Sequence, residues 1–230
     1  MADGIVIMSA LLRTDLEIIR KELGARPSDV PGKYRKITVK GVPFRVSRFV
    51  SPRCCNVAVM EMNTLIMNIS TIIITPFEKK APLVNIDVFR IPGKTKYICE
   101  VYELDGSNHA SFYEDIPCIG LNSKPLSGDF WFSDLRTFVK CFSKGPFQGG
   151  KDRYEQFLTE FTDRTCRIYK EAGSLGIPGD EARDFQIRRI KDYAHGLIEK
   201  GGVSTEVFKS AMSVEQLKDF YDTVLFRTRE

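Results

Sequence analysis

The strongest constraint on the fold is a long region in which apolar and polar residues alternate, as they do in β-strands with one buried face. From Lys33 to Glu103 the sequence follows this period of two and is rich in β-branched and aromatic residues. Glycine, proline and asparagine interrupt the region at intervals, which indicates turns. The interruptions predict strands over residues 34–40, 43–50, 55–62, 65–75, 83–91 and 96–103. Because the turns are short, we expect an antiparallel sheet.

Helical patterns lie on both sides of this region. Close to the N-terminus, Thr14 and Glu17 have the spacing of a capping box, and Gly24 supplies a stop. After Gly145, apolar residues with a period of 3.6 predict helices over about 152–173 and 180–199 and further helices from 204 and from 213. Ser213 and Gln216 again have capping-box spacing. Strands followed by helices, without alternation of the two, indicate an α+β layered fold in one domain over residues 1–230.

The composition excludes several classes of function. Lys and Arg number 34 against 30 Asp and Glu, and a net charge of +4 is too small for a dedicated nucleic-acid binder. The glycine-rich loops that bind ATP or dinucleotides are absent from the sequence. Only two histidines are present, and no cysteines have zinc-site spacing, so we expect no metal site. The 6 cysteines are scattered, as is typical of an intracellular protein with reduced thiols.

We expect a soluble protein that neither crosses nor binds a membrane. No apolar run approaches the roughly 18 residues that a membrane span requires. The first residues, Met1 to Gly4, lack the basic flank and long apolar region of a signal peptide.

The most informative residues are two carboxylates inside apolar strands. Glu61 shares a strand face with Val57 and Val59. Asp87 shares a strand face with Leu83, Asn85 and Phe89. A buried carboxyl group loses hydration, which raises its pKa and makes it a candidate proton donor near neutral pH. The alternative is that one or both lie near a strand end, where they face water or pair with a nearby arginine.

Several segments resemble the ferredoxin-dependent bilin reductases. The segment 75–77 followed by 81–89 is similar to the strand–turn–strand core of that family, in which the second strand carries a central aspartate, here Asp87. Glu61 falls on the preceding strand, where phycocyanobilin-forming members keep a glutamate. The segment 132–139 and the C-terminal part from Gln186 to Phe226 are also similar, so that the resemblance extends over about residues 50–226.

The resemblance implies a three-layer α/β/α sandwich that binds an open-chain tetrapyrrole between the sheet and the C-terminal helices. Reduction would proceed by single electrons from a reduced 2Fe–2S ferredoxin, with no bound flavin or nicotinamide. Asp87 would be the central proton donor, and Glu61 would assist protonation or hold the pigment. Asn85, Phe89 and Thr71 would contact the pigment. We expect a monomer, in the cytoplasm of a bacterium or in a plastid of a eukaryote.

The sequence also departs from the family pattern. Thr71 stands near the position at which phycocyanobilin-forming members place a histidine. Gly201 and Gly202 occupy the position of a second acidic residue, and Val203 that of a basic one. A different double bond, another substrate, or loss of the reaction with retention of the pocket are therefore open. The alternatives are an enzyme related to red chlorophyll catabolite reductase and a tetrapyrrole-binding protein without redox activity.

Further candidates come from charge and aromatic patterns. Lys94 and Lys96, at the turn before the last predicted strand, could meet the two propionates of a bilin. Trp131, between two phenylalanines, could pack against the pigment. A basic cluster on the predicted helix 180–199, together with two lysines after the fourth strand, is a candidate docking surface for an acidic ferredoxin. The cluster comprises Arg183, Arg188, Arg189, Lys191, Lys79 and Lys80.

Overall fold

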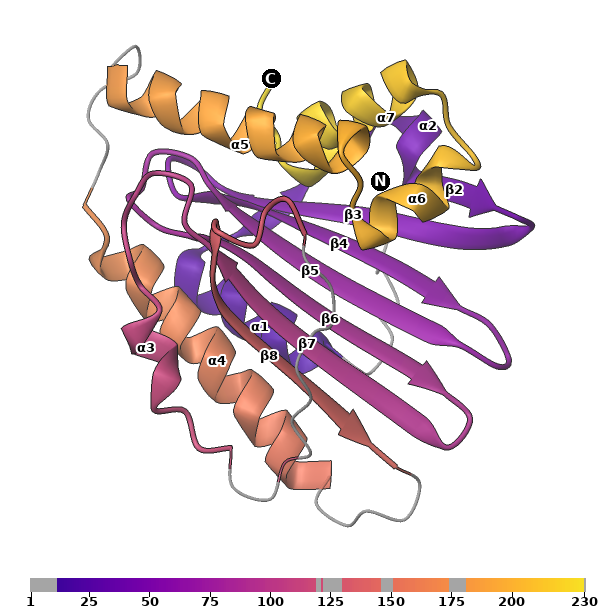
Figure 1. Cartoon of the computed structure of the whole chain (residues 1–230), viewed down its shortest axis with the longest axis horizontal. Helices are drawn as coiled ribbons and strands as arrows, with labels where there is room; N and C mark the ends of the chain where they lie inside the picture. Colours follow the sequence, from indigo (N-terminus) through magenta and orange to yellow (C-terminus); the bar gives the residue numbers. More distant parts are fainter. Residues whose placement is uncertain (1–11, 119–120, 122–129, 146–150, 174–180, 230) are drawn as a thin grey trace.

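The structure, a computed structural model, describes residues 12–118, 121, 130–145, 151–173 and 181–229 (Figure 1). Its centre is an antiparallel sheet with the strand order β1-β3-β4-β5-β6-β7-β8, and β2 pairs with β3. The strands are Arg26–Ser28 (β1), Lys36–Val39 (β2), Val42–Ser51 (β3), Cys55–Asn63 (β4), Asn68–Pro76 (β5), Leu83–Ile91 (β6), Lys94–Tyr102 (β7) and Arg136–Lys144 (β8).

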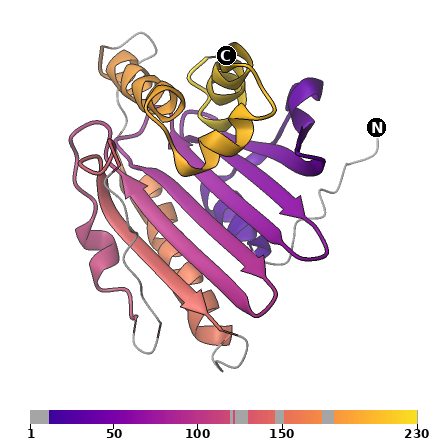
Figure 2. The same cartoon turned by 45° about the vertical axis from the view of Figure 1, so that its right-hand side comes forward.

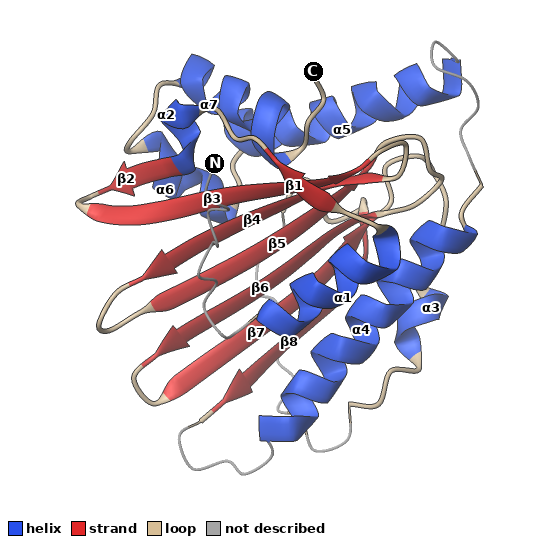
Figure 3. Cartoon of the chain, turned by 180° about the vertical axis from the view of Figure 1, so that it is seen from behind, coloured by secondary structure: helices blue, strands red, loops and turns tan. Residues whose placement is uncertain are grey.

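Helices cover both faces of this sheet, so the predicted three-layer arrangement is confirmed. Two long helices cross one face, which is seen from behind in Figure 3, and a short helix lies beside them. The C-terminal helices cover one end of the opposite face (Figure 2). The first face carries α1 (Arg13–Leu23), α3 (Ser111–Glu114) and α4 (Lys151–Glu171), and the second carries α2 (Gly32–Arg35), α5 (Glu181–Glu199), α6 (Val203–Lys209), α7 (Val214–Phe220) and the π-helical turn η1 (Tyr221–Leu225).

The period of two in the strands divides the apolar residues between two cores. On β4, Val57 and Val59 pack with α1 and α4, while Ala58 and Met60 belong to the core under the C-terminal helices. Because both faces are covered, the inner strands are buried along nearly their whole length. Polar side chains on these strands are therefore shielded from bulk water and need hydrogen-bond partners within the protein or a ligand.

Most of the predicted elements exist, with ends that differ by a few residues. The prediction missed two strands, β1 and β8, and the short helices α2 and α3. The Ser213–Gln216 capping box is confirmed by hydrogen bonds in both directions. The capping box proposed for Thr14 and Glu17 is wrong, because α1 already begins at Arg13 and its N-cap residue makes no side-chain hydrogen bond. Gly24 ends that helix in the left-handed conformation, as expected.

A β-bulge shapes the edge of the sheet on which the site depends. Val101 of β7 pairs with Phe138 of β8, but the next residue, Tyr102, pairs with Arg136, so that Thr137 is the extra residue. The extra residue shifts the alternation of β8 and brings Arg136 to the face covered by the C-terminal helices.

Candidate functional site

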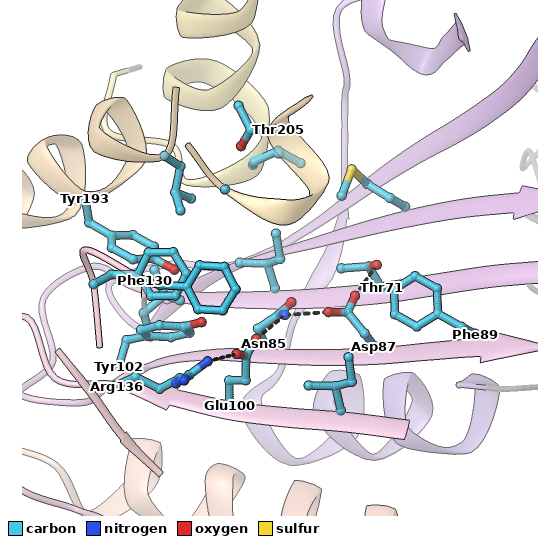
Figure 4. A pocket seen from close by; sticks show the side chains of 18 of the residues that line it. Thr71, Asn85, Asp87, Phe89, Glu100, Tyr102, Phe130, Arg136, Tyr193 and Thr205 are labelled. Carbon is cyan, nitrogen blue, oxygen red and sulfur yellow. Dashed lines mark hydrogen bonds and ion pairs between the residues drawn. The ribbon is translucent and has the colours of Figure 1, made fainter. Parts of the chain in front are cut away.

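A cavity of about 570 Å³ lies between the sheet and the C-terminal helices. Strands β4 to β8 form one wall, α5, α6 and η1 form the opposite wall, and the segment around Phe130 and Phe132 closes one end (Figure 4). Its volume is within the range of about 300–1,000 Å³ that is usual for pockets holding organic ligands of moderate size. Apolar side chains make up most of the lining, and the polar groups gather on β5, β6, β7 and β8.

Asp87 lies in the sheet wall of this cavity. The strand register places it opposite Thr71 of β5, and both side chains are directed to the cavity face (Figure 4). The Thr71 hydroxyl donates to Oδ1 of Asp87 at 2.5 Å, and the Asn85 amide nitrogen donates to Oδ2 at 2.7 Å. The side chain of Asp87 is buried, with 7% of its residue surface exposed. Two donors therefore fix the carboxyl group while it borders the cavity.

Burial raises the pKa of Asp87 from its ordinary value of 3.8 to about 6. The hydrogen bond from Thr71 opposes this rise, because it stabilises the carboxylate. The negative charge of Glu100 raises the pKa further, whereas Asn85 and the more distant Lys96 lower it. A carboxyl group in this range carries a proton in an appreciable fraction of molecules near neutral pH, which is the requirement for a general acid.

A second buried carboxylate, Glu100, extends the polar arrangement along the sheet. The Asn85 amide nitrogen also donates to Oε2 of Glu100 at 3.1 Å. Arg136 forms an ion pair with Oε1 of the same carboxylate at 3.0 Å, and both partners are largely buried. The bulge in β8 makes this pair possible, because it brings Arg136 to the cavity face. A continuous chain of contacts thus runs from Thr71 through Asp87 and Asn85 to Glu100 and Arg136 (Figure 4).

One oxygen of this arrangement is left without a partner in the described structure. Oδ1 of Asn85 is buried and has no hydrogen-bond partner among the residues that the structure describes. A buried acceptor without a partner is destabilising, by about 1–3 kcal/mol, unless a ligand or water donates to it. An acceptor of this kind beside the carboxyl group of Asp87 would be satisfied by an N–H group if a small movement of the Asn85 side chain turned it toward the cavity.

Aromatic rings line the end of the cavity near Glu100 and Arg136. Tyr102, Phe130 and Tyr193 lie together on that side, as Figure 4 shows, with ring centroids of Tyr102 and Tyr193 5.0 Å apart. Burial raises the pKa of both tyrosines well above the ordinary value, so their hydroxyls stay protonated. Flat aromatic faces favour packing against a flat conjugated ligand.

The helical wall contributes hydroxyl groups where the resemblance to the bilin reductases led us to expect an acidic residue. Gly202 lines the cavity, and a Cβ atom at this position would lie 2.9 Å from Leu197 and 3.0 Å from the Thr205 hydroxyl. A larger residue would therefore require its neighbours to move. The Thr205 and Tyr221 hydroxyls, both of residues that line the cavity, lie 2.8 Å apart, and burial raises the pKa of Tyr221 to about 12.

Most of the residues selected from the sequence line this cavity. Thr71, Asn85 and Asp87 form its polar centre, and Phe89 lies on the other side of Asp87 from the tyrosines (Figure 4). The two lysines of the β6–β7 hairpin, Lys94 and Lys96, also belong to its lining; the first is exposed and the second is half-buried. Their roles toward a ligand remain predictions.

Glu61 does not belong to this site, and its proposed role beside Asp87 is wrong. It is buried, but it pairs with Ser70 of β5, which in turn pairs with Val88 of β6, and Val88 belongs to the core under α1 and α4. Alternation therefore directs Glu61 to the opposite face of the sheet. The residue of β4 that lies in register with Thr71 and lines the cavity is Met60.

Trp131 is also placed differently from the prediction, since it is not among the residues that line the cavity. Its indole nitrogen donates to the carbonyl oxygen of Gly201 at 2.9 Å, and its ring packs directly on Gly196 of α5. It holds the segment that carries Phe130 and Phe132 against the helical layer, and those two phenylalanines, rather than the tryptophan, border the cavity.

Sequence reasoning missed Glu100 and Arg136. Glu100 carries the same signal that selected Asp87, a carboxylate between apolar residues of one strand, with Ile98 and Tyr102 on its face. Arg136 has no such signal, because its position depends on the bulge. Among the described residues no group of three or more histidine, cysteine or acidic side chains is arranged to hold a metal ion.

The lysines of the predicted basic docking surface lie beside the helix that carries its arginines, and several of its side chains have partners within the protein. Arg183 is directed to Glu78, Arg189 donates to the carbonyl oxygen of Leu104, and Lys79 donates to that of Ala172. These contacts hold the connections between strands and helices together and engage part of the charge that a docking surface would present.

Sequence comparison gives no match to a family model or to a curated protein. Comparison of structures gives a match. Phytochromobilin synthase from tomato, crystallised in complex with biliverdin, matches with a TM-score of 0.69 over 95% of this chain and 82% of that chain. The chain has the fold of phytochromobilin synthase. The sequence identity is 15%, so the likeness to that enzyme shows a shared fold, and the ligand of this chain is a separate question.

Membrane insertion through a helix finds no support in the structure. In the part of the chain that it describes, no helix combines the length and the apolar character needed to cross a bilayer.

Proposed function

We propose that this protein binds a linear tetrapyrrole such as biliverdin in the cavity and reduces it, with electrons from reduced ferredoxin and a proton from Asp87. The observation that carries the proposal is the position of Asp87: a buried carboxyl group with a pKa of about 6, held by two donors at the wall of a large, mostly apolar cavity. The fold of phytochromobilin synthase, whose crystal holds biliverdin, supports the same ligand class.

The cavity suits such a ligand in shape and in polarity. A linear tetrapyrrole is an extended conjugated molecule with pyrrole N–H groups at its centre and two propionates at its edge. The Asn85 acceptor and the Asp87 carboxyl group would face the N–H groups. The aromatic rings around Tyr102 would pack against the conjugated system. Lys94 and Lys96 would attract the propionates from the edge of the cavity.

The reaction that this arrangement favours is a proton-coupled reduction. Two electrons and two protons saturate one double bond of the pigment, and ferredoxin delivers the electrons one at a time. Asp87 would give its proton to the pigment as its charge becomes more negative, and Thr71 and Asn85 would stabilise the carboxylate that remains. Regeneration of the acid and the second proton of the reduction would both draw on solvent, which reaches the cavity at the edge where the exposed Lys94 lines it.

Spectroscopy on the purified protein tests this proposal. Biliverdin is added first, and the visible spectrum is recorded before and after reduced ferredoxin is supplied. A bound pigment whose absorption band is lost or moved during reduction supports a reductase. A stable complex that does not respond to reduced ferredoxin contradicts the proposed reaction and favours a binding protein. The same assay with a red chlorophyll catabolite tests the alternative substrate, and failure to bind either pigment contradicts the ligand class.

A further inference from the structure

A second cavity lies where the C-terminal segment meets the end of the sheet. It has a volume of about 200 Å³ and is bordered by the β3–β4 turn, the residues after β5, the first half of α5 and the segment after η1. Phe226 borders both this cavity and the larger one. The proposed tetrapyrrole chemistry does not use this second cavity.

Arginine dominates its lining. Arg53, Arg183, Arg227 and Arg229 belong to it, and Glu78 is the carboxylate among the lining residues. The excess of positive charge is therefore large for so small a space. The charge of Arg227 also acts on a neighbouring arginine: burial and this charge together lower the pKa of Arg48 on β3.

In the described part of the chain, carboxylates pair with two of these four arginines and leave the other two uncompensated. Nε of Arg183 is 3.8 Å from Oε1 of Glu78, beyond hydrogen-bond distance, and it is buried without a hydrogen-bond partner among the described residues. Arg227 lies over the ring of Phe77, 5.1 Å from its centroid, and Arg229 pairs with Asp219. No ion pair within the described residues compensates Arg53 or Arg227.

Two of these arginines occupy backbone positions that favour glycine. Arg53, in the β3–β4 turn, has φ of 60°, and Arg227, two residues after η1 ends at Leu225, has φ of 47°. The left-handed region is strained for residues with a Cβ atom, and such strain often marks a functional position. Both strained arginines lie at the same cavity.

We propose that this arginine cavity binds the phosphate group of a small anion. A guanidinium group presents parallel N–H donors that match phosphate oxygens in pairs, and three or four of them around one space fit a compact dianion. The cavity is large enough for a phosphate group and too small for an extended chain. A phosphate there would bring negative charge to a space in which Arg53 and Arg227 have no carboxylate partner among the described side chains, and would offset the repulsion among the arginines.

Isothermal titration of the full chain tests this site. Inorganic phosphate and a phosphate monoester, glycerol 3-phosphate, are titrated separately in chloride buffer at constant ionic strength, and thermal unfolding is followed in parallel. We expect saturable binding of at least one of them, with a rise in Tm that levels off. The tighter of the two ligands shows whether a free phosphate or an esterified one is the better occupant.

Glycine substitutions supply matched variants, because they remove the guanidinium group and relieve the backbone strain at the same time. Arg227→Gly and Arg53→Gly should each weaken phosphate binding about tenfold or more, because a charge-assisted contact is lost. Lys40→Gly is the control: Lys40 has φ of 48° but lies in the β2–β3 turn, away from the cavity, and should leave binding unchanged. An absence of saturable binding, or equal binding by Arg227→Gly and the unaltered chain, would overturn the proposal.

Discussion

Replacing Asp87 with asparagine is expected to make the protein more stable while it removes the proton donor. The pKa of Asp87 is 3.8 ordinarily and about 6 in the folded chain, and this difference corresponds to about 3 kcal/mol at about 1.4 kcal/mol per pKa unit. Because the folded state binds the proton more tightly, this stabilising contribution is complete below pH 3.8 and is lost as the pH rises through about 6. Asparagine does not ionise, so the folded variant does not bear the cost of a buried negative charge at neutral pH.

The size of the gain follows from what asparagine retains. It keeps the shape of the side chain, but the hydrogen bonds from Thr71 and Asn85 no longer meet a charge, which costs about 1 kcal/mol. The net stabilisation of Asp87→Asn above pH 7 is therefore about 2 kcal/mol. At about 2–4 °C per kcal/mol for a chain of this size, Tm should rise by about 4–8 °C. Near pH 4 the difference in Tm should be close to zero or slightly negative.

Thermal unfolding of both proteins between pH 4 and pH 8 measures this difference. Asp15 supplies a matched control, because burial between α1 and α4 also raises its pKa to about 6 while it accepts a hydrogen bond from Thr162. Asp15→Asn should show a similar gain with pH and should keep its pigment turnover, whereas Asp87→Asn should lose turnover by about 100-fold or more. A stability difference for Asp87→Asn that does not grow between pH 4 and pH 7 would contradict a raised pKa of Asp87 in the folded chain.

Three further results are expected. Thr71→Val removes a hydrogen bond that lowers the pKa of Asp87, so the alkaline limb of the pH profile of kcat/KM should move to higher pH. Glu100→Gln removes a charge that raises this pKa, so the limb should move to lower pH; movement of both variants in the same direction would contradict the assignment. Glu61→Gln, on the other face of the sheet, should leave that profile and turnover unchanged, and a displaced limb would show contact with the site. Gly196→Ala would place a Cβ atom 2.4 Å from the Trp131 ring and should cost about 1–3 kcal/mol of stability, read as a lower Tm; an unchanged Tm would show that the ring moves freely.

The sequence alone was sufficient for the layered fold and for the face of the sheet on which Asp87 lies. Alternation places Asp87 and Asn85 on one face of a strand whatever the length of the neighbouring loops, and helices after the strands indicate that this face is covered. Those two facts favour burial of Asp87, whereas the cavity beside it depends on where the C-terminal helices lie. The two facts needed no knowledge of the register between strands.

The same rule shows why Glu61 was misassigned. The resemblance to the bilin reductases located it only to a strand, and a shift of one residue moves a side chain to the other face of a sheet. The register with Thr71 then selects Met60, a thioether that donates no proton. Its own alternation with Val57 and Val59 had already grouped Glu61 with the residues that pack on α1 and α4.

Arg136 and Trp131 illustrate what a local pattern does not contain. The bulge at Tyr102 depends on the fit between two strands, so Arg136 could not be assigned to a face from its own neighbours. Trp131 was selected as an aromatic residue near the site, but the absence of a side chain at Gly196 gives its ring a place on α5. Both positions are set by contacts between segments that are distant in the sequence.

The most direct test of the account is a comparison of pigment binding and pigment reduction in the unaltered protein and in Asp87→Asn. Biliverdin is bound to each at saturating concentration, and the decay of its visible band is followed after addition of reduced ferredoxin at pH 6. Both proteins are expected to bind the pigment, and only the unaltered protein is expected to consume it at an appreciable rate. Equal decay in the two proteins, or no binding to either, would contradict it.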